Sequence, residues 1–143
     1  MRNLSITKTI WVYTTILINA IVLINFNKVK AQSINRNLLM QQALEAHKVR
    51  EIKSEQVSFP PLQIAPVHIH TCPAVGYIVS GKCLLQVEGE EEKILNEGDS
   101  FFEPADKRIL HFDNLSESDS LIFTVFYLID KEKELVKLEK RNP

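Results

Sequence analysis

The chain has 143 residues, of which 45% are hydrophobic and 24% charged, and its formal net charge is −1, which is typical of one globular domain. Four glycines and six prolines exclude a collagen-like or proline-rich disordered chain, and two cysteines exclude a disulfide framework and a four-thiolate zinc site. No repeat with a period of about 20 to 50 residues is present, which argues against a solenoid or a propeller.

Charge is unevenly distributed along the chain. Residues 1–31 contain four of the 17 basic side chains and none of the 18 acidic ones, so residues 32–143 carry 13 basic and 18 acidic side chains and a formal charge of −5. Binding to nucleic acid requires a basic stripe that faces the phosphates. We therefore expect no nucleic-acid partner.

Residues 1–31 have the order of a secretory signal: basic residues, an uncharged apolar run over residues 9–27, and then Val29-Lys30-Ala31 as a cleavage site. Cleavage there would leave Gln32 first. The run is also close to the roughly 20 residues that span a bilayer, so a retained membrane anchor through residues 9–27 is the alternative. Both interpretations predict an N-terminal helix and a domain outside the cytoplasm, either periplasmic, secreted or held by the anchor.

Beyond this segment we expect an N-terminal arm (residues 32–48), a β-domain (residues 49–130) and a charged tail (residues 131–143). The pattern of the arm fits a helix or an edge strand equally well. Short runs separated by glycine, asparagine, aspartate and proline turns predict an all-β sandwich or barrel. The expected strands lie in residues 49–59, 63–70, 75–80, 83–87, 92–95, 100–103, 108–113 and 121–129.

Alternation along the chain indicates which faces are buried. Cys83, Leu85 and Val87 share one face of their strand and are expected to point into the core. The run over residues 121–129 is almost entirely apolar, which favours a strand covered on both faces. The charged tail is expected to form a short helix with one apolar patch.

The first feature that suggests chemistry is His68-Ile69-His70. Residues i and i+2 of a strand point to the same face, so both imidazoles would project together into a barrel and could share one cation. The stretches Pro66–Gly81 and Gly98–Pro104 resemble the two conserved motifs of the cupin family. The positions that match those motifs are His68, His70, Gly81, Gly98, Pro104 and Asn114.

This resemblance implies a jelly-roll β-barrel, often dimeric, that holds a divalent metal with three histidines and one glutamate. Two of the four ligand positions depart from the family pattern. Ala74 takes the place of the glutamate and Ile109 that of the last histidine. Only His68 and His70 match cleanly.

His111 is the candidate replacement for the missing histidine. It lies two residues beyond Ile109, so a regular strand would place it on the same face. We therefore expect a metal site made by His68, His70 and His111. Imidazole ligands suit zinc, manganese, iron, nickel or copper, which the pattern does not distinguish, better than magnesium or calcium.

The other chemically active residues receive plainer interpretations. Cys72 and Cys83 are expected to be unpaired thiols, with a disulfide permitted outside the cytoplasm and metal ligation by Cys72 as a minor alternative. Asp99 is interpreted as a turn residue and Glu103 as a solvated carboxylate on the barrel rim. His47 receives no role.

Three functions compete at this point. The first is a binding module, in which the barrel holds a small molecule and, in one version, a divalent metal, without turnover. The second is a metal-dependent cupin enzyme of the dioxygenase, isomerase or decarboxylase type that uses His68 and His70 with His111. The third is a purely oligomeric role that uses the outward faces of the sheets, and the family resemblance implies a homodimer.

Overall fold

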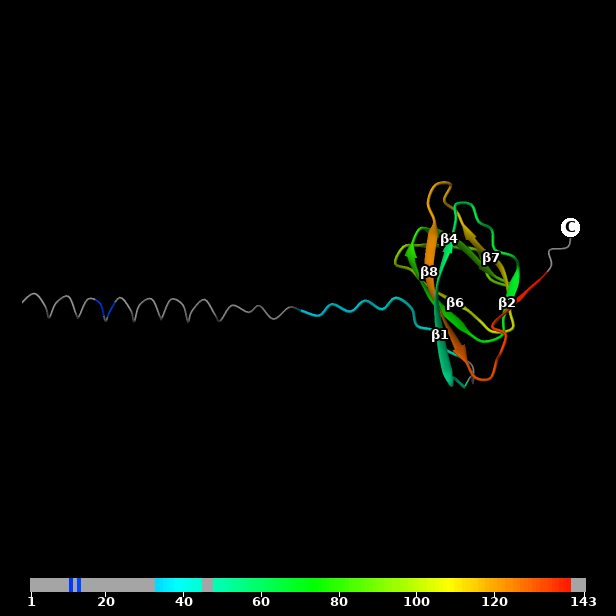
Figure 1. Cartoon of the computed structure of the whole chain (residues 1–143), viewed down its shortest axis with the longest axis horizontal. Coiled ribbons are helices and arrows are strands. Elements are labelled where there is room, and N and C mark those ends of the chain that lie inside the picture. Colours follow the sequence, from blue (N-terminus) through cyan, green and yellow to red (C-terminus); the bar gives the residue numbers. More distant parts are fainter. Residues whose placement is uncertain (1–10, 12, 14–32, 45–47, 140–143) are drawn as a thin grey trace, which may run out of the picture. The chain divides into compact units, whose positions relative to one another are not determined.

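The computed structural model describes residues 11, 13, 33–44 and 48–139. The chain divides into residues 1–37 and residues 38–143, and every strand among the described residues lies in the second part (Figure 1). The strands are β1 (Glu51–Phe59), β2 (His68–His70), β3 (Ala74–Ser80), β4 (Lys82–Val87), β5 (Lys93–Asn96), β6 (Ser100–Glu103), β7 (Arg108–Asn114), β8 (Leu121–Ile129) and β9 (Val136–Leu138).

The expected signal or anchor helix cannot be compared with the structure. Apart from Trp11 and Tyr13, residues 1–31 lie outside the described residues, and so does Gln32. Among the described residues, no helix is long and apolar enough to cross a membrane. Residues 33–44 of the arm form neither a helix nor a strand.

The strands form two antiparallel sheets, as expected for an all-β domain. One sheet has the order β1-β8-β3-β6 and the other the order β5-β4-β7-β2-β9. Neighbours in each sheet are often far apart in sequence: β1 pairs along its whole length with β8, and β2 lies between β7 and β9. The fold therefore brings the two histidines of β2 against segments from the second half of the chain.

Apolar side chains at alternate positions form the core. Cys83, Leu85 and Val87 of β4 are all buried, which confirms the expected inward face of that strand. The ring centroids of Phe112 and Phe123 lie 4.7 Å apart, which packs the two sheets against each other.

The strand β8 is fully buried on one face and half-buried or exposed on the other, which corrects the expectation that both of its faces are buried. Leu121, Phe123 and Val125 are buried, whereas Phe126 is 40% exposed. An apolar run is therefore not enough to infer a strand covered on both faces, because apolar residues also make up much of an ordinary protein surface.

The charged tail forms a strand where a helix was predicted. β9 pairs with β2, so that His68 lies opposite Leu138 and His70 opposite Val136. The side chain of Arg108 fixes the end of β9, because its Nη2 lies 2.8 Å from an oxygen of Glu139. The edge of β2 needs hydrogen-bond partners, and the tail supplies them, which the local pattern of charges did not reveal.

Candidate metal centre

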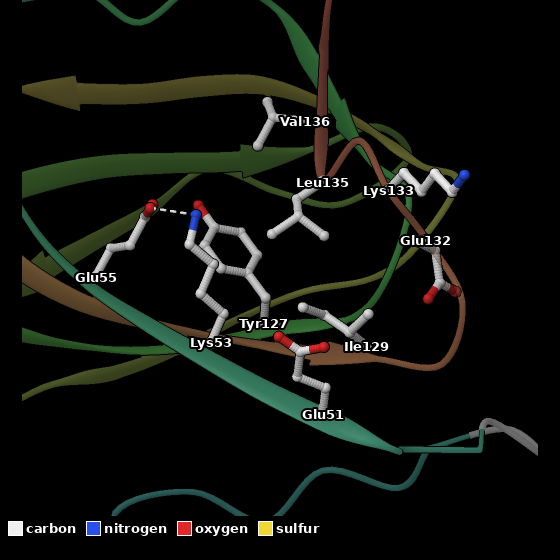
Figure 2. A pocket seen from close by; sticks show the side chains of 9 residues that line it. All are labelled: Glu51, Lys53, Glu55, Tyr127, Ile129, Glu132, Lys133, Leu135 and Val136. Carbon is white, nitrogen blue, oxygen red and sulfur yellow. Dashed lines mark ion pairs between the residues drawn. The ribbon is translucent and has the colours of Figure 1, made fainter.

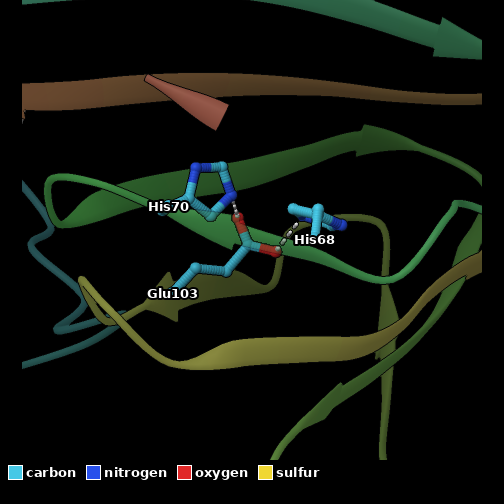
Figure 3. Close-up of side chains that lie close together, drawn as sticks. All are labelled: His68, His70 and Glu103. Atoms are coloured by element: carbon cyan, nitrogen blue, oxygen red, sulfur yellow. Dashed lines mark ion pairs between the residues drawn. The ribbon is translucent and has the colours of Figure 1, made fainter. Parts of the chain in front are cut away.

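Three side chains from two strands meet inside the barrel: His68 and His70 from β2, and Glu103 from the end of β6. The two histidines point to the same face, as predicted from their spacing. Glu103 is two residues beyond the buried Phe101 and shares its inward face. Figure 3 shows the Glu103 carboxylate between the two imidazole rings, and one ligand atom from each of the three residues lies within 4.8 Å of the others.

The three groups are close together and largely removed from solvent. Nε2 of His70 lies 2.9 Å from Oε2 of Glu103, and both side chains are 4% exposed. Nε2 of His68 lies 3.9 Å from Oε1 of Glu103, and the His68 side chain is 12% exposed. The site is thus compact enough for one ion to contact all three groups.

Several polar atoms of this cluster lack a hydrogen bond. Among the described residues, neither ring nitrogen of His70 nor Oε1 of Glu103 has a hydrogen bond, because the 2.9 Å contact between Nε2 of His70 and Oε2 of Glu103 does not have the angles of one. Buried polar atoms nearly always have such a partner, and those that do not need an explanation. A cation between the three side chains would satisfy these atoms, so the residues fit a bound metal.

The backbone orients His68 for this role. Its Nδ1 lies 2.9 Å from the carbonyl oxygen of Pro66, so the tautomer that makes this hydrogen bond donates from Nδ1 and leaves the lone pair of Nε2 facing Glu103. Metal-binding histidines usually donate a hydrogen bond from the ring nitrogen that does not face the metal, as His68 does here.

Tyr127 forms a wall of the site. Its ring centroid lies 5.8 Å from that of His70. Burial, followed by the negative charges of Glu55 and Glu103, raises the pKa of Tyr127 to about 12. Its hydroxyl group is therefore protonated at neutral pH.

A mostly apolar cavity of about 190 Å³ opens in front of the three side chains. A second hollow of about 360 Å³ shares Tyr127 and Val136 with it and is lined by charged side chains of β1, including the ion pair between Lys53 and Glu55 (Figure 2). The barrel cavity therefore adjoins a charged hollow. The apolar wall of the barrel cavity includes Val57, Phe59, Phe112, Phe123 and Val125.

The sequence profile of the cupin domain matches residues 55–127, just over half of the chain. The chain belongs to the cupin family. No curated protein matches this cupin. Its two antiparallel sheets form the jelly-roll barrel expected from the resemblance.

Solved structures agree with this assignment. This cupin is similar to a cupin-like protein from Thermotoga maritima, at 18% identity and a TM-score of 0.52, over 62% of this chain and 64% of that one. It is similar to an RmlC-like cupin from Shewanella frigidimarina, at 26% identity and a TM-score of 0.50, over 57% and 69% of the two chains.

A third similar structure belongs to a larger protein. The DMSP lyase DddQ from Ruegeria pomeroyi is 21% identical, with a TM-score of 0.53, over 61% of this chain and 42% of that one. The cupin chain thus spans about two fifths of the length of the lyase. At this identity the similarity concerns the fold alone.

The two departures from the family's ligand pattern lie beside the cluster. Ala74 of β3 is fully buried and pairs with Glu103 of β6. Ile109 of β7 is fully buried and pairs with His68. The carboxylate of this site therefore comes from Glu103 on β6, whereas the family motif would place it at Ala74 on the neighbouring strand β3. The position of the family's third histidine holds the apolar Ile109, beside His68.

The interpretation of Glu103 as a solvated rim carboxylate is wrong, because the residue is only 3% exposed. A signal for the inward position was present in the sequence. If Phe101 is a core residue, then Glu103, two residues later on the same strand, faces the core as well. Pro104, which follows Glu103 and ends the strand, is typical of a barrel rim and therefore favoured the wrong prediction.

The structure does not bring His111 to His68 and His70. Gln86 pairs with His111 whereas Val87 pairs with Ile109, so the register shifts by one residue at Leu110. Such a bulge reverses the alternation of side chains along a strand. The expectation that His111 shares the face of Ile109 depended on a regular strand and is not met.

His111 has a different partner. Its Nδ1 lies 2.6 Å from Oδ2 of Asp113, and its side chain is 34% exposed. Asp113 in turn accepts a hydrogen bond from the backbone N–H of Ala65 at 3.0 Å. These contacts hold the segment before β2 against β7, which is a structural role.

The remaining predicted residues lie away from the cluster. Cys72 and Cys83 are free, buried thiols, as expected, and burial is the main cause that raises the pKa of each. Asp99 is a turn residue, as expected, because its Oδ2 accepts a hydrogen bond from the backbone N–H of Asn96 at 2.8 Å. His47 lies outside the described residues.

Proposed function

We propose that this cupin binds a divalent transition metal between His68, His70 and Glu103 and a small molecule in the adjoining cavity. The observation that supports this most strongly is the set of buried polar atoms on His70 and Glu103 that have no hydrogen-bond partner among the described residues.

The donor set indicates the class of metal. Two imidazoles and one carboxylate suit zinc, manganese, iron, nickel or copper, whereas magnesium and calcium prefer sites made of oxygen ligands. When bound, such an ion supplies Lewis acidity to a ligand oxygen. Three protein ligands leave at least one coordination position for water or for that ligand.

A metal-free alternative exists for the same geometry. A protonated His70 would form a buried ion pair with Glu103, whose nearest atoms lie 2.9 Å apart. This alternative predicts no specific affinity for zinc. It also predicts that His68, whose nearest atom lies 3.9 Å from Glu103, contributes little to this ion pair.

Calorimetric titration of zinc into the chelator-treated full-length protein tests the proposal. We expect one zinc ion per chain. The zinc affinity of His70→Ala and of Glu103→Ala should be lower by about two orders of magnitude or more, since losing even a hydrogen-bond partner of a metal ligand costs roughly 10–100-fold. His111→Ala is the matched control and should keep the parent's affinity, because His111 contacts Asp113 outside the cluster.

Two results would contradict the proposal. One is parent protein that binds no zinc. The other is a loss of zinc in His111→Ala as large as in His70→Ala, which would favour the site predicted from sequence. Circular dichroism of each variant checks that it is folded, so that a loss of zinc affinity can be distinguished from unfolding.

The metal-dependent enzyme remains the alternative, with Glu103 in the place that the sequence analysis gave to His111. The DMSP lyase has its own reaction, and a similarity of fold does not transfer it. The proposal therefore stops at metal and ligand binding and assigns no turnover.

A further inference from the structure

We infer that the small molecule held in the barrel is an organic monoanion of about the size of benzoate, with its carboxylate at the metal centre and its apolar body against the phenylalanine wall. This inference rests on the proposed metal site and deepens it. Three properties of the cavity support it: the distribution of polar groups, the balance of charge and the volume.

Polar groups occur at one end of the cavity only. Its polar lining residues are His68, His70, Glu103 and Tyr127. The remaining lining residues are apolar. A ligand with hydroxyl groups along its whole length, such as a sugar, would leave several of them without hydrogen bonds, which is costly in a buried site. The cavity therefore suits a molecule with one polar end and an apolar body.

The charge of the site indicates which polar group the ligand carries. A divalent ion with one carboxylate and two neutral imidazoles has a net charge of +1. No lysine or arginine is among the lining residues of this cavity in the described part of the chain. A single carboxylate on the ligand would balance the ion, whereas an ammonium group would be repelled.

The volume and the wall indicate the size and shape of the body. The cavity measures about 190 Å³. An engineered apolar cavity of about 150 Å³ binds benzene, so this one has room for a six-membered ring and a carboxylate. The rings of Phe59 and Phe123 are 5.5 Å apart at an interplanar angle of 84°, and both line the cavity. Edges and faces of aromatic rings presented in this way favour a flat ring in the ligand.

Access to the cavity lies beside β9. Leu138 lines the cavity and is 68% exposed, so one side of the cavity reaches the surface. Leu138 is also the cross-strand partner of His68, so this opening lies beside the metal centre. A carboxylate that enters past Leu138 can therefore reach the metal centre directly.

Titration of the zinc-loaded full-length protein with benzoate, benzyl alcohol and benzylamine tests the inference. We expect benzoate to bind at least about tenfold more tightly than benzyl alcohol, and benzylamine not to bind. Benzoate should lose at least about tenfold in affinity when zinc is absent.

A matched pair of variants locates the apolar body. Val57 lines the cavity, so Val57→Asp should lower the benzoate affinity of the zinc-loaded protein at least about tenfold. Val79, which is 37% exposed on the face of β3 away from the core, provides the control: Val79→Asp should leave this affinity unchanged.

The outcomes separate this inference from the proposed function. If the parent protein binds no zinc, both fail. If it binds zinc but prefers benzyl alcohol to benzoate, or binds benzoate equally well without zinc, only the inference about the ligand fails. Benzoate binding that Val57→Asp leaves unchanged also overturns it.

Discussion

At the scale of single residues, the candidate centre shows that a metal-binding carboxylate can be carried by a neighbouring strand and still reach the same site. Ala74 and Glu103 are direct neighbours across the β3–β6 pair. The Cβ atoms of such neighbours are about 4.5–5.5 Å apart, so a carboxylate on either residue reaches similar space. Ala74 stands where the family motif has glutamate, but the structure places the carboxylate of Glu103 beside that position.

This relation predicts the result of an exchange of the two residues. Glu103→Ala should lose zinc, and adding Ala74→Glu in the same chain should restore affinity to within about tenfold of the parent, because the new carboxylate lies on a buried, inward-facing neighbour. Calorimetry with zinc measures both variants. Thr124→Glu, added to Glu103→Ala on the outward face of β8, is the control and should restore nothing.

A double variant with Ala74→Glu that binds zinc no better than Glu103→Ala alone would show that the carboxylate is not a ligand from either position.

The sequence predicted His68 and His70 correctly as an inward-facing pair, because their relation is two residues on one strand. It did not predict their third partner. Glu103 meets them through pairing between distant strands, and the turn chemistry around Pro104 favoured a solvated position. His111 failed for a different reason: a single unpaired residue, Leu110, shifts the register of β7.

At the scale of elements, the alternation of apolar and polar residues predicted the strands well. The charged residues of the tail, in contrast, led to a wrong prediction of a helix. The strands from β3 to β8 lie within one residue of the predicted runs, because alternation and turn residues are properties of adjacent residues. The tail was misjudged because its structure depends on β2, which is more than 60 residues earlier in the chain. A three-residue edge strand carries too little pattern to be distinguished from a charged helix.

The packing between β3 and β6 gives a prediction at this scale. Gly76 pairs with Phe101, and a Cβ added at Gly76 would overlap the phenylalanine ring. Gly76→Ala should therefore lower the free energy of unfolding by about 1–3 kcal/mol, as overpacked cores do. Urea unfolding measures this change.

Phe101→Leu tests whether the ring is the cause. If it is, the double variant should lose less stability than the sum of the two single losses. Additive losses would mean that Gly76 is required for another reason.

At the scale of the whole molecule, the chain combines an N-terminal segment with no acidic residue and a body with a formal charge of −5. We propose that the first part exports the second, so that the cupin barrel acts outside the cytoplasm. The order of basic residues, apolar run and cleavage site in residues 1–31 supports this proposal. The described strands are consistent with an independent domain, since they all lie in residues 38–143.

Fractionation of cells that produce the protein with a C-terminal tag tests export, and N-terminal sequencing tests cleavage. We expect the tagged protein outside the cytoplasm with Gln32 as its first residue. A full-length product in the membrane fraction would favour the anchor. A full-length soluble product in the cytoplasm would contradict both interpretations.

The most direct test of the metal centre is anomalous diffraction from crystals of the zinc-loaded protein, recorded at the zinc absorption edge. The account predicts one strong peak per chain, about 2.0–2.2 Å from Nε2 of His68, Nε2 of His70 and a carboxylate oxygen of Glu103. The absence of a peak between these three side chains, or a peak at His111 in their place, would contradict it.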